Sequence, residues 1–365
     1  MSFSMGIVGL PNVGKSTLFN ALTKKSVPAE NYPFCTIDPS VGIVAVPDER
    51  LTALSSFSNS KKTVPAAAQF VDIAGLVEGA AKGEGLGNKF LSHIRETDAI
   101  LQVVRIFEDD KVIHVSGNID PVRDISVINL ELVLADFETV TKRLASIGKD
   151  ANRGDKDAVR EEKALKKAVA LLEAGHLASS GDYSSEELSV LKNVHLISMK
   201  PILYALNKKA GGKNLDEIRD GRFEKLIEFI KSMGAGYVVV DAKIEDELKE
   251  FEGSEKESLR GELGGGDDGV NSLIRESYST LGLITFFTTG EDETRGWTIV
   301  KGSTAPLAGA AIRTDFKNKF IRAEVVFWKD LLDAGSYGEA RNKGLVRTEG
   351  KEYVVKDGDV IEFKI

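Results

Sequence analysis

The pattern of apolar and polar positions in residues 1–131 predicts strands and helices in alternation. Short apolar runs are typical of strands buried in a parallel sheet, and apolar residues spaced three or four apart are typical of helices that cover it. Helices are expected to begin near Gly14 and Gly87. This order indicates an α/β domain with a mostly parallel sheet. Its strands are predicted at residues 5–8, 41–46, 66–71 and 99–106.

The α/β pattern returns later in the chain, after an interruption. Residues 201–206 and 236–240 have the pattern of two more buried strands, and the amphipathic segment 216–232 between them is expected to be helical. The interruption carries apolar residues at helical spacing on both sides of a polar turn, which predicts a helical hairpin inserted into the α/β domain. The helices of the hairpin are expected at 129–147 and 158–174, and its turn at 148–157.

The chain changes character after the last of these strands. Residues 241–268 hold 11 acidic and 4 basic side chains, a composition typical of a solvated connector. A short helix is predicted at 270–280, and beyond it apolar residues alternate with a period of two. The order strand, strand, helix and paired strands predicts a small C-terminal β-grasp domain. Its strands are expected at 284–288, 295–299 and 352–365, the last of these around a turn at 357–359.

These patterns predict three domains, and the composition limits what they can do. A hydrophobic share of 42% and a charged share of 28% are ordinary for a globular protein. No apolar run approaches the roughly 20 residues of a membrane span, so a cytoplasmic protein without a membrane partner is expected. The domain boundaries are placed at 1–131 with 196–280 for the α/β domain, 132–195 for the inserted hairpin and 281–365 for the β-grasp domain.

Cysteine count and charge narrow the possibilities further. The single cysteine, Cys35, excludes an internal disulfide and any cysteine-cluster metal site. A net charge of -8 argues against a protein that coats nucleic acid over its whole surface, and no DNA partner is expected. A local basic surface that contacts RNA stays open. The sequence indicates no oligomeric state.

The stretch GLPNVGKS at residues 9–16 matches the phosphate-binding pattern G-x-x-x-x-G-K-[ST] at every fixed position. It follows a predicted strand and precedes a predicted helix, as the motif requires. Glycines let backbone N–H groups turn toward phosphates at the helix N-terminus, Lys15 reaches the β and γ phosphates, and the Ser16 hydroxyl binds Mg²⁺. Thr36, between the first helix and the second strand, is a candidate for a second Mg²⁺ ligand that senses the γ-phosphate.

The stretch DIAG at residues 72–75 gives the D-x-x-G pattern of a nucleotide switch. Asp72 is expected to hold Mg²⁺ through water, and the Gly75 N–H to contact the γ-phosphate. Many GTPases carry a glutamine at the next position to orient the attacking water, but Leu76 stands there. An apolar side chain cannot orient water. Either hydrolysis is slow, or another group supplies this function.

The base-recognition segment departs from the GTPase pattern N-K-x-D. Asn207 and Lys208 supply its first half, but Ala210 replaces the aspartate that accepts hydrogen bonds from guanine. Because charge-assisted hydrogen bonds contribute about 1.5 to 3 kcal/mol each, this loss is expected to remove most guanine preference. The segment 240–243, with Ala242 as its candidate contact, lies where a second base-contacting loop is expected.

Together these features resemble the Obg-like ATPases of the YchF type, in the translation-factor class of P-loop proteins. The resemblance covers essentially the whole chain, including NYPFCTID at 31–38, DDKVIHVSG at 109–117 and a C-terminal module similar to a TGS domain. It implies a P-loop, G-domain-like fold and a nucleotidase that prefers ATP to GTP, uses Mg²⁺ and carries a hydrophobic residue in place of the catalytic glutamine. The family usually has a glutamate where Ala210 stands. The implied nucleotide contacts are Asn12, Val13, Gly14, Lys15, Ser16, Thr17, Asn207 and Lys208, with Ser16 and Thr36 at Mg²⁺.

The resemblance also implies a ribosomal partner, either the large subunit or the whole ribosome, with rRNA as a candidate contact. Residues 141–172 hold 9 basic and 5 acidic side chains, an excess of 9 - 5 = 4 positive charges, which fits either an RNA contact or a solvated helix face. A second candidate surface surrounds three C-terminal aromatic residues, which could instead form the β-grasp core. It comprises Arg313, Lys317, Lys319, Arg322 and Lys329 around Phe316, Phe320 and Trp328.

Two further alternatives stay open. His114 is either a surface histidine without a task or, as the resemblance implies, a catalytic residue near the γ-phosphate. The chain as a whole is either an ATP hydrolase that turns over in a cycle or a ribosome-binding switch in which hydrolysis is incidental. Leu76 is the residue that keeps the second alternative, the ribosome-binding switch, under consideration. A GTPase of the same class is disfavoured by Ala210.

Overall fold

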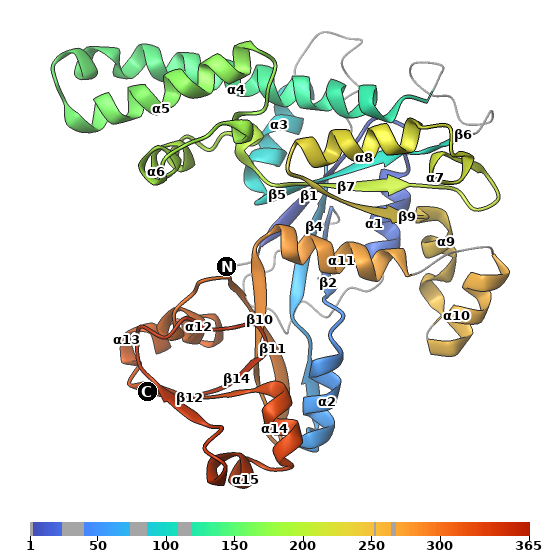
Figure 1. Ribbon diagram of the computed structural model, residues 1–365, viewed down its shortest axis with the longest axis vertical. Helices are drawn as coiled ribbons and strands as arrows, with labels where there is room; N and C mark the ends of the chain where they lie inside the picture. Colours follow the sequence, from blue (N-terminus) through green and yellow to red (C-terminus); the bar gives the residue numbers. More distant parts are fainter. Residues whose placement is uncertain (1–2, 24–39, 74–85, 109–118, 252, 264–267) are drawn as a thin grey trace. The chain divides into compact units, whose positions relative to one another are not determined.

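The computed structural model describes residues 3–23, 40–73, 86–108, 119–251, 253–263 and 268–365 (Figure 1). The chain divides into two compact units. The α/β unit comprises Ser4–Ala21 and Phe70–Val270, and the C-terminal unit comprises the described residues of Met1–Phe3, Leu22–Gln69 and Asn271–Ile365. The division into three domains stays a prediction. No helix in the described ranges is both long and apolar enough to cross a bilayer.

A six-stranded sheet in the order β2-β4-β1-β5-β7-β9 carries the α/β unit, and the unit boundary falls within β4. The pairs β1–β5, β5–β7 and β7–β9 are parallel. Every residue of β1, β5 and β7 is buried, which explains why these strands are mostly apolar in sequence. The mostly parallel sheet is confirmed. The strands are β1 Ser4–Val8, β2 Val41–Ala45, β4 Ala67–Asp72, β5 Ala99–Arg105, β7 Ile202–Asn207 and β9 Gly236–Val240.

Helices α1 (Lys15–Thr23) and α3 (Leu86–Glu96) begin where the sequence predicts them. The single helix expected at 216–232 is wrong, because Arg219 and Gly221 adopt left-handed φ angles of 56° and 84°. The segment therefore forms α7 and α8, and a two-stranded sheet lies before them. These elements are α7 Leu215–Ile218, α8 Arg222–Ser232, β6 Phe107–Glu108 and β8 Lys213–Asn214.

The described part of the acidic segment 241–268 is mostly helical and buries some of its charged residues, so the expectation of a connector that is solvated throughout is wrong. It contains α9 (Ala242–Glu247), a 3₁₀ turn at Leu248–Glu250 and α10 (Gly253–Glu262). Arg260 donates to both carboxylate oxygens of Glu245, at 2.9 and 3.1 Å, and both side chains are buried. Four of the charges counted as solvated are thus engaged within the segment, since Lys256 and Asp268 also lie within 4 Å of this pair.

The inserted helical hairpin is present and is longer than predicted. Helix α4 (Pro121–Asn152) begins at a proline capped by Asp120, and α5 (Lys156–Glu173) follows a turn shorter than the expected 148–157. Gly154 makes this turn with a φ of 84°. Two 3₁₀ turns and one further helix, which the periodicity did not indicate, follow α5: Ala178–Ser180, α6 Ser185–Val194 and Ile197–Met199.

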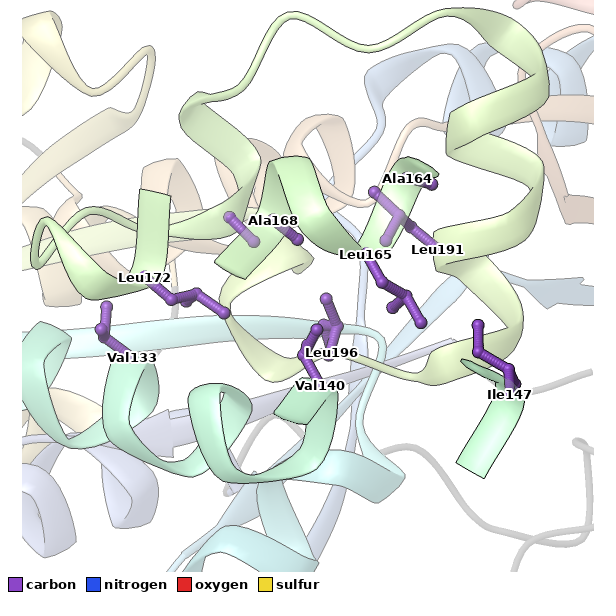
Figure 2. Packing of buried hydrophobic residues seen from close by; sticks show 10 residues of the cluster. Val133, Val140, Ile147, Ala164, Leu165, Ala168, Leu172, Leu191 and Leu196 are labelled. Carbon is purple, nitrogen blue, oxygen red and sulfur yellow. The ribbon is translucent and has the colours of Figure 1, made fainter. Parts of the chain in front are cut away.

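An apolar core of its own holds the hairpin together. Figure 2 shows side chains from α4 and α5 meeting those of Leu191 on α6 and Leu196 beyond it. Val140 and Leu165 are completely buried there. The buried carboxylate of Asp136 on α4 accepts from the backbone N–H groups of Ile197 and Ser198 at 3.0 and 2.7 Å. The hairpin is therefore tied to the polypeptide that leads back into the sheet.

The C-terminal unit contains a second sheet in the order β13-β12-β14-β10-β11-β3. Antiparallel β10 and β11, the helix α12 and a central β14 parallel to β10 give the β-grasp arrangement that the sequence predicts. The paired strands expected at 352–365 are wrong: only β14 forms there, and Val354 makes an isolated bridge to Thr304. The elements are β3 Lys62–Val64, β10 Leu283–Thr288, β11 Glu293–Val300, α12 Ala305–Ile312, β12 Arg322–Phe327, β13 Arg347–Glu349 and β14 Asp359–Lys364.

Residues 49–64 are an unpredicted part of this unit. Strand β3 pairs in parallel with β11, and α2 (Glu49–Phe57) buries Leu51 and Leu54 against Phe287 and Val360. The side chain of Phe320 is buried in the neighbouring cluster, so at least one of the C-terminal aromatic residues forms core. The remaining helices are α11 Gly269–Thr280, α13 Phe316–Lys319, α14 Trp328–Ala334 and α15 Tyr337–Asn342.

Candidate nucleotide-binding site

The loop between β1 and α1 has the backbone that a phosphate cradle needs. Gly14 has a φ of 97°, and a Cβ there would lie 2.3 Å from Nδ2 of Asn207. A Cβ on Gly9 would lie 2.6 Å from the carbonyl oxygen of Val103. Asn12 adopts a left-handed φ of 61° and is exposed. Glycine is therefore required at both fixed positions of the motif, for contact reasons as well as for its conformational freedom.

The charged groups expected around phosphate and Mg²⁺ lie at this loop. The Lys15 ammonium donates to the carbonyl oxygen of Leu10 at 2.8 Å, across the loop. Burial raises the pKa of the Asp72 carboxyl, and the positive charge of Lys15 opposes this shift. Ser16 is exposed in the first turn of α1. A hydroxyl next to Lys15 in the chain and a carboxylate that interacts with its charge fit a Mg²⁺–triphosphate ligand, because Mg²⁺ prefers oxygen donors.

Asn207 connects the phosphate loop to the second base-recognition segment. It is the last residue of β7 and is almost fully buried. Its Nδ2 donates to the carbonyl oxygen of Val13 at 2.8 Å, and its Oδ1 accepts from the backbone N–H of Ala242 at 3.0 Å. The buried Val13 side chain shows that this residue acts through its backbone. One side chain thus joins three segments that are far apart in the sequence.

The loop that follows Asn207 is tied to the neighbouring strand. The backbone N–H of Lys208 donates to the carbonyl oxygen of Val240 at 2.9 Å. The Lys208 ammonium lies 3.9 Å from Oδ2 of Asp216, whose pKa is raised by burial and lowered by this lysine. The backbone N–H of Ala210 donates to Oδ2 of Asp241 at 2.5 Å. The methyl group of Ala210 has no atom that can form a hydrogen bond with a base.

The structure therefore brings most of the predicted site residues together. Asn12, Val13, Gly14, Lys15, Ser16 and Thr17 form the loop and the first turn of α1, and Asp72, Asn207, Lys208 and Ala242 lie at the ends of β4, β7 and β9. Three predicted residues, Thr36, Gly75 and His114, lie outside the described residues, as does Leu76. Their roles stay predictions.

Asp241 lies in the predicted base-contacting segment 240–243, but no role of its own was predicted for it. It caps α9 by accepting from the N–H groups of Lys243 and Ile244 at 3.1 and 3.0 Å. An aspartate directly after a strand and directly before a helix is a recognisable cap signal. Its contact with Ala210 could not be predicted from the sequence, because it joins residues 31 positions apart.

The fold and this site define a P-loop nucleoside-triphosphatase of the G-domain type. Residues 4–134 match the family model of the 50S ribosome-binding GTPase, and residues 283–365 match the model of the YchF GTPase C-terminal domain, described as a protein of unknown function.

Similarity extends over the full length of the chain. "Ribosome-binding ATPase YchF" of Bacillus subtilis (strain 168) is 52% identical and covers 100% of this chain and 99% of its own length. The protein of the same name from Escherichia coli O157:H7 is 45% identical with the same coverage. The solved structure of the YchF GTPase from Schizosaccharomyces pombe is 38% identical, with a TM-score of 0.87 and coverage of 100% of this chain and 98% of that one. The chain belongs to the YchF family.

Proposed function

We propose that this protein binds and hydrolyses ATP with Mg²⁺, prefers ATP to GTP, and associates with ribosomes in the cytoplasm. The observation that carries the proposal is the set of contacts made by Asn207, which hold an intact phosphate loop against a base-recognition loop in which Ala210 replaces a carboxylate. The phosphate loop supports nucleoside-triphosphate binding, and the missing carboxylate supports the preference for ATP.

At the phosphates, each group of this chain has a separate task. Backbone N–H groups of residues 12–17 bind the phosphate oxygens at the N-terminus of α1, and Lys15 neutralises negative charge on the β and γ phosphates. Ser16, Thr36 and Asp72 are the residues that hold Mg²⁺. When bound, this ion neutralises the charge that develops on the phosphate oxygens. The N–H of Gly75 contacts the γ-phosphate.

At the base, the missing carboxylate decides between the two purines. Guanine presents a ring N–H and an amino group to the residue at position 210, and alanine accepts no hydrogen bond from either. Adenine presents no such pair of donors at that edge, so it loses nothing. The names of the relatives differ on this point, since the curated proteins are called ATPases and the solved structure is called a GTPase.

Turnover tests the hydrolase directly. We expect Mg²⁺-dependent phosphate release from ATP, and loss of ATP binding in Lys15→Ala because the charge at the β and γ phosphates is removed. Gly154→Ala, in the hairpin turn, is a control distant in sequence from the site, with nothing within 4 Å of the added methyl group. Equal ATP hydrolysis by wild type and Lys15→Ala would refute the assigned site.

We propose that His114 supplies part of the catalytic function that Leu76 cannot, because an apolar side chain does not orient the attacking water. We expect His114→Ala to lower the rate of hydrolysis with little change in ATP affinity, the signature of a contact made mainly in the transition state. His176→Ala, on the hairpin, provides the matched histidine control. Calorimetry and single-turnover rates separate the two effects. An unchanged rate in His114→Ala would make this residue a surface histidine.

Ribosome association is proposed from the names of the full-length relatives, and the structure changes which surface is the better candidate. On the hairpin, Lys163 and Lys167 lie 3.7 and 3.3 Å from Glu187, and Lys166 lies 2.9 Å from Glu162. Glu162 is already counted among the 5 acidic residues of 141–172, so only Glu187 lowers the excess, to 4 - 1 = 3 positive charges. All three lysines are nevertheless engaged in ion pairs. In the C-terminal unit, Lys317, Arg322 and Lys329 are exposed and form no ion pair with another described residue. The other two basic residues of this predicted surface, Arg313 and Lys319, lie within 4 Å of Asp315. This second surface is the more available for phosphate contacts.

Co-sedimentation with ribosomes tests this surface. Replacing Lys317, Arg322 and Lys329 by glutamate should weaken sedimentation more than the same change at Lys163, Lys166 and Lys167, and should make it less dependent on salt. Lys351→Glu, also exposed, is the control. Deleting the β-grasp domain is a poorer test, because it would uncover Leu51 and Leu54 of α2. Wild-type sedimentation by both triple variants would exclude these surfaces.

The second candidate function is a ribosome-binding switch whose hydrolysis is incidental. Leu76, where many GTPases have the water-orienting glutamine, is the observation that favours it. Single-turnover hydrolysis with and without ribosomes distinguishes the two candidates. Strong stimulation by ribosomes supports a hydrolytic cycle, and an unchanged slow rate supports the switch.

A further inference from the structure

We propose that Asp241 is a positioning residue of the base site, which fixes the loop at Ala210 in the conformation that receives a purine. The proposal rests on the proposed function, since it concerns how the same site holds the base of its nucleotide. The sequence places Asp241 in the expected second base-contacting segment, 240–243, but assigns it no role there.

The carboxylate of Asp241 is shared between two loops. Its Oδ2 accepts from the N–H of Ala210 at 2.5 Å, and its Oδ1 accepts from the N–H groups of Lys243 and Ile244 at 3.1 and 3.0 Å. The residue is 8% exposed. Hydrogen bonds from backbone N–H groups to an ionised carboxylate are stronger than those between neutral groups. Asp241 is thus a firm connection between the loop after β7 and the start of α9.

Three bonds join these loops in succession. The N–H of Lys208 donates to the carbonyl oxygen of Val240, the N–H of Ala242 donates to Oδ1 of Asn207, and the N–H of Ala210 donates to Asp241. The last bond reaches furthest along the loop beyond β7. The opposite side of this loop is held by Asn214, which exchanges bonds with the backbone of Lys209 at 2.9 Å. Without Asp241, the Ala210 side of the loop loses its contact with α9.

Ala210 has no carboxylate to bind guanine, so the nearby carboxylate of Asp241 must be considered as a substitute acceptor. A carboxylate has about four lone-pair positions for hydrogen bonds, and backbone N–H groups already use three of those of Asp241. It is therefore committed to the protein and is a poor acceptor for guanine. The carboxylate of Asp241 therefore holds the base loop in position and does not form hydrogen bonds with the purine.

This arrangement separates the two ends of the nucleotide. The phosphate cradle is made by residues 9–17. Among the described residues, the Asp241 carboxylate accepts from Ala210, Lys243 and Ile244, which lie outside the cradle. Loosening the base loop should weaken every purine nucleotide by a similar factor. It should leave the binding of a triphosphate without a base unchanged. That difference distinguishes a positioning role from a general loss of structure.

Two variants test the proposal, with ATP, GTP and inorganic tripolyphosphate as calorimetric probes. Asp241→Asn keeps one oxygen to cap α9, since asparagine caps helices as well as aspartate does, but it can turn an amide N–H₂ toward the N–H of Ala210. Asp241→Ser keeps a shorter cap and also loses the bridge. We expect both variants to bind ATP and GTP about tenfold more weakly, the loss of one charge-assisted hydrogen bond, with tripolyphosphate affinity unchanged. The KM for ATP should rise while kcat stays constant.

Each other result has a distinct meaning. Unchanged ATP affinity in both variants, with normal thermal unfolding, would overturn the role of Asp241 alone. Weaker binding of GTP only would overturn it in favour of a guanine acceptor, and an equal loss for tripolyphosphate would show that Asp241 merely stabilises the fold. Wild-type protein that binds neither ATP nor GTP would overturn the proposed function itself.

Discussion

The phosphate end and the base end of the site are built in different ways. At the phosphate end, backbone conformation is decisive: Gly9 and Gly14 leave no room for a side chain, and the helix N-terminus supplies the N–H groups. At the base end, two side chains, Asn207 and Asp241, fasten loops that are 31 or more residues apart. A local motif can specify the first arrangement. Only the folded chain can specify the second.

The difference follows from what each end binds. Phosphate groups are alike in every nucleoside triphosphate, so a fixed cradle of donors serves all of them. Bases differ only in the donors and acceptors at their edges, so the loops around them must be held in place and can vary in their side chains. This accounts for an intact G-x-x-x-x-G-K-[ST] motif together with an altered N-K-x-D motif in one chain.

The largest effect is expected for stability, from the buried ion pair between Glu245 on α9 and Arg260 on α10. Arg260→Leu removes the hydrogen-bonded partner of the buried Glu245 on α9 and leaves the longer contact with Lys256 at 3.8 Å, a change expected to cost about 3 kcal/mol of the free energy of unfolding. Denaturant unfolding measures this loss. The control is Arg153→Leu, whose exposed partner Asp150 lies 3.6 Å away and is worth about 0.5 kcal/mol. Equal losses of unfolding free energy in the two variants would show that the buried Glu245–Arg260 pair stabilises the fold no more than an exposed pair does.

The phosphate end should be the more sensitive end for binding. Gly14→Ala places a methyl group 2.3 Å from Nδ2 of Asn207 at a φ of 97°, so the loop and its contact with Asn207 must both shift. We expect affinity for ATP, GTP and tripolyphosphate to fall together by about 100-fold, or about 2.7 kcal/mol. Gly154→Ala has a similar φ of 84° without a close neighbour, and it should leave binding unchanged. Retained tripolyphosphate binding in Gly14→Ala would contradict a rigid cradle.

The base end should change selectivity with a small effect on affinity. Ala210→Asp introduces an acceptor for guanine, and a shift in the ATP-to-GTP affinity ratio of about tenfold is expected, the value of one charge-assisted hydrogen bond. Ala210→Asn is the matched control, because it adds similar volume without a charge. Competition between labelled ATP and unlabelled GTP measures the ratio. No shift in Ala210→Asp would mean that position 210 does not face the base.

The contrast between the two ends also explains what could be predicted. Strands such as β5 and β7 are buried on both faces, so their sequences are mostly apolar and are recognisable as short runs. The phosphate loop is a local motif, and its residues are confirmed as one loop leading into α1. The hairpin was also evident from its periodicity, because apolar residues such as Val140 and Leu165 form its core.

Prediction failed where long-range contacts decide the structure. Residues 241–268 look solvated because acidic residues predominate. In the structure, however, Arg260 on α10 forms a buried ion pair with Glu245 on α9. Strand β3 is only three residues long, and its pairing with β11 depends on a chain segment more than 200 residues away. The contact between Asp241 and Ala210 is of the same kind. None of these contacts leaves a periodic signal in the sequence.

The central claim is that this site receives ATP at least as well as GTP because its base loop lacks the guanine-reading carboxylate. Calorimetric titration of the wild-type protein with ATP and with GTP, both in excess Mg²⁺, tests it most directly. The account predicts that ATP binds at least as tightly as GTP. Tighter binding of GTP would contradict it, and would mean that another group reads guanine in place of Ala210.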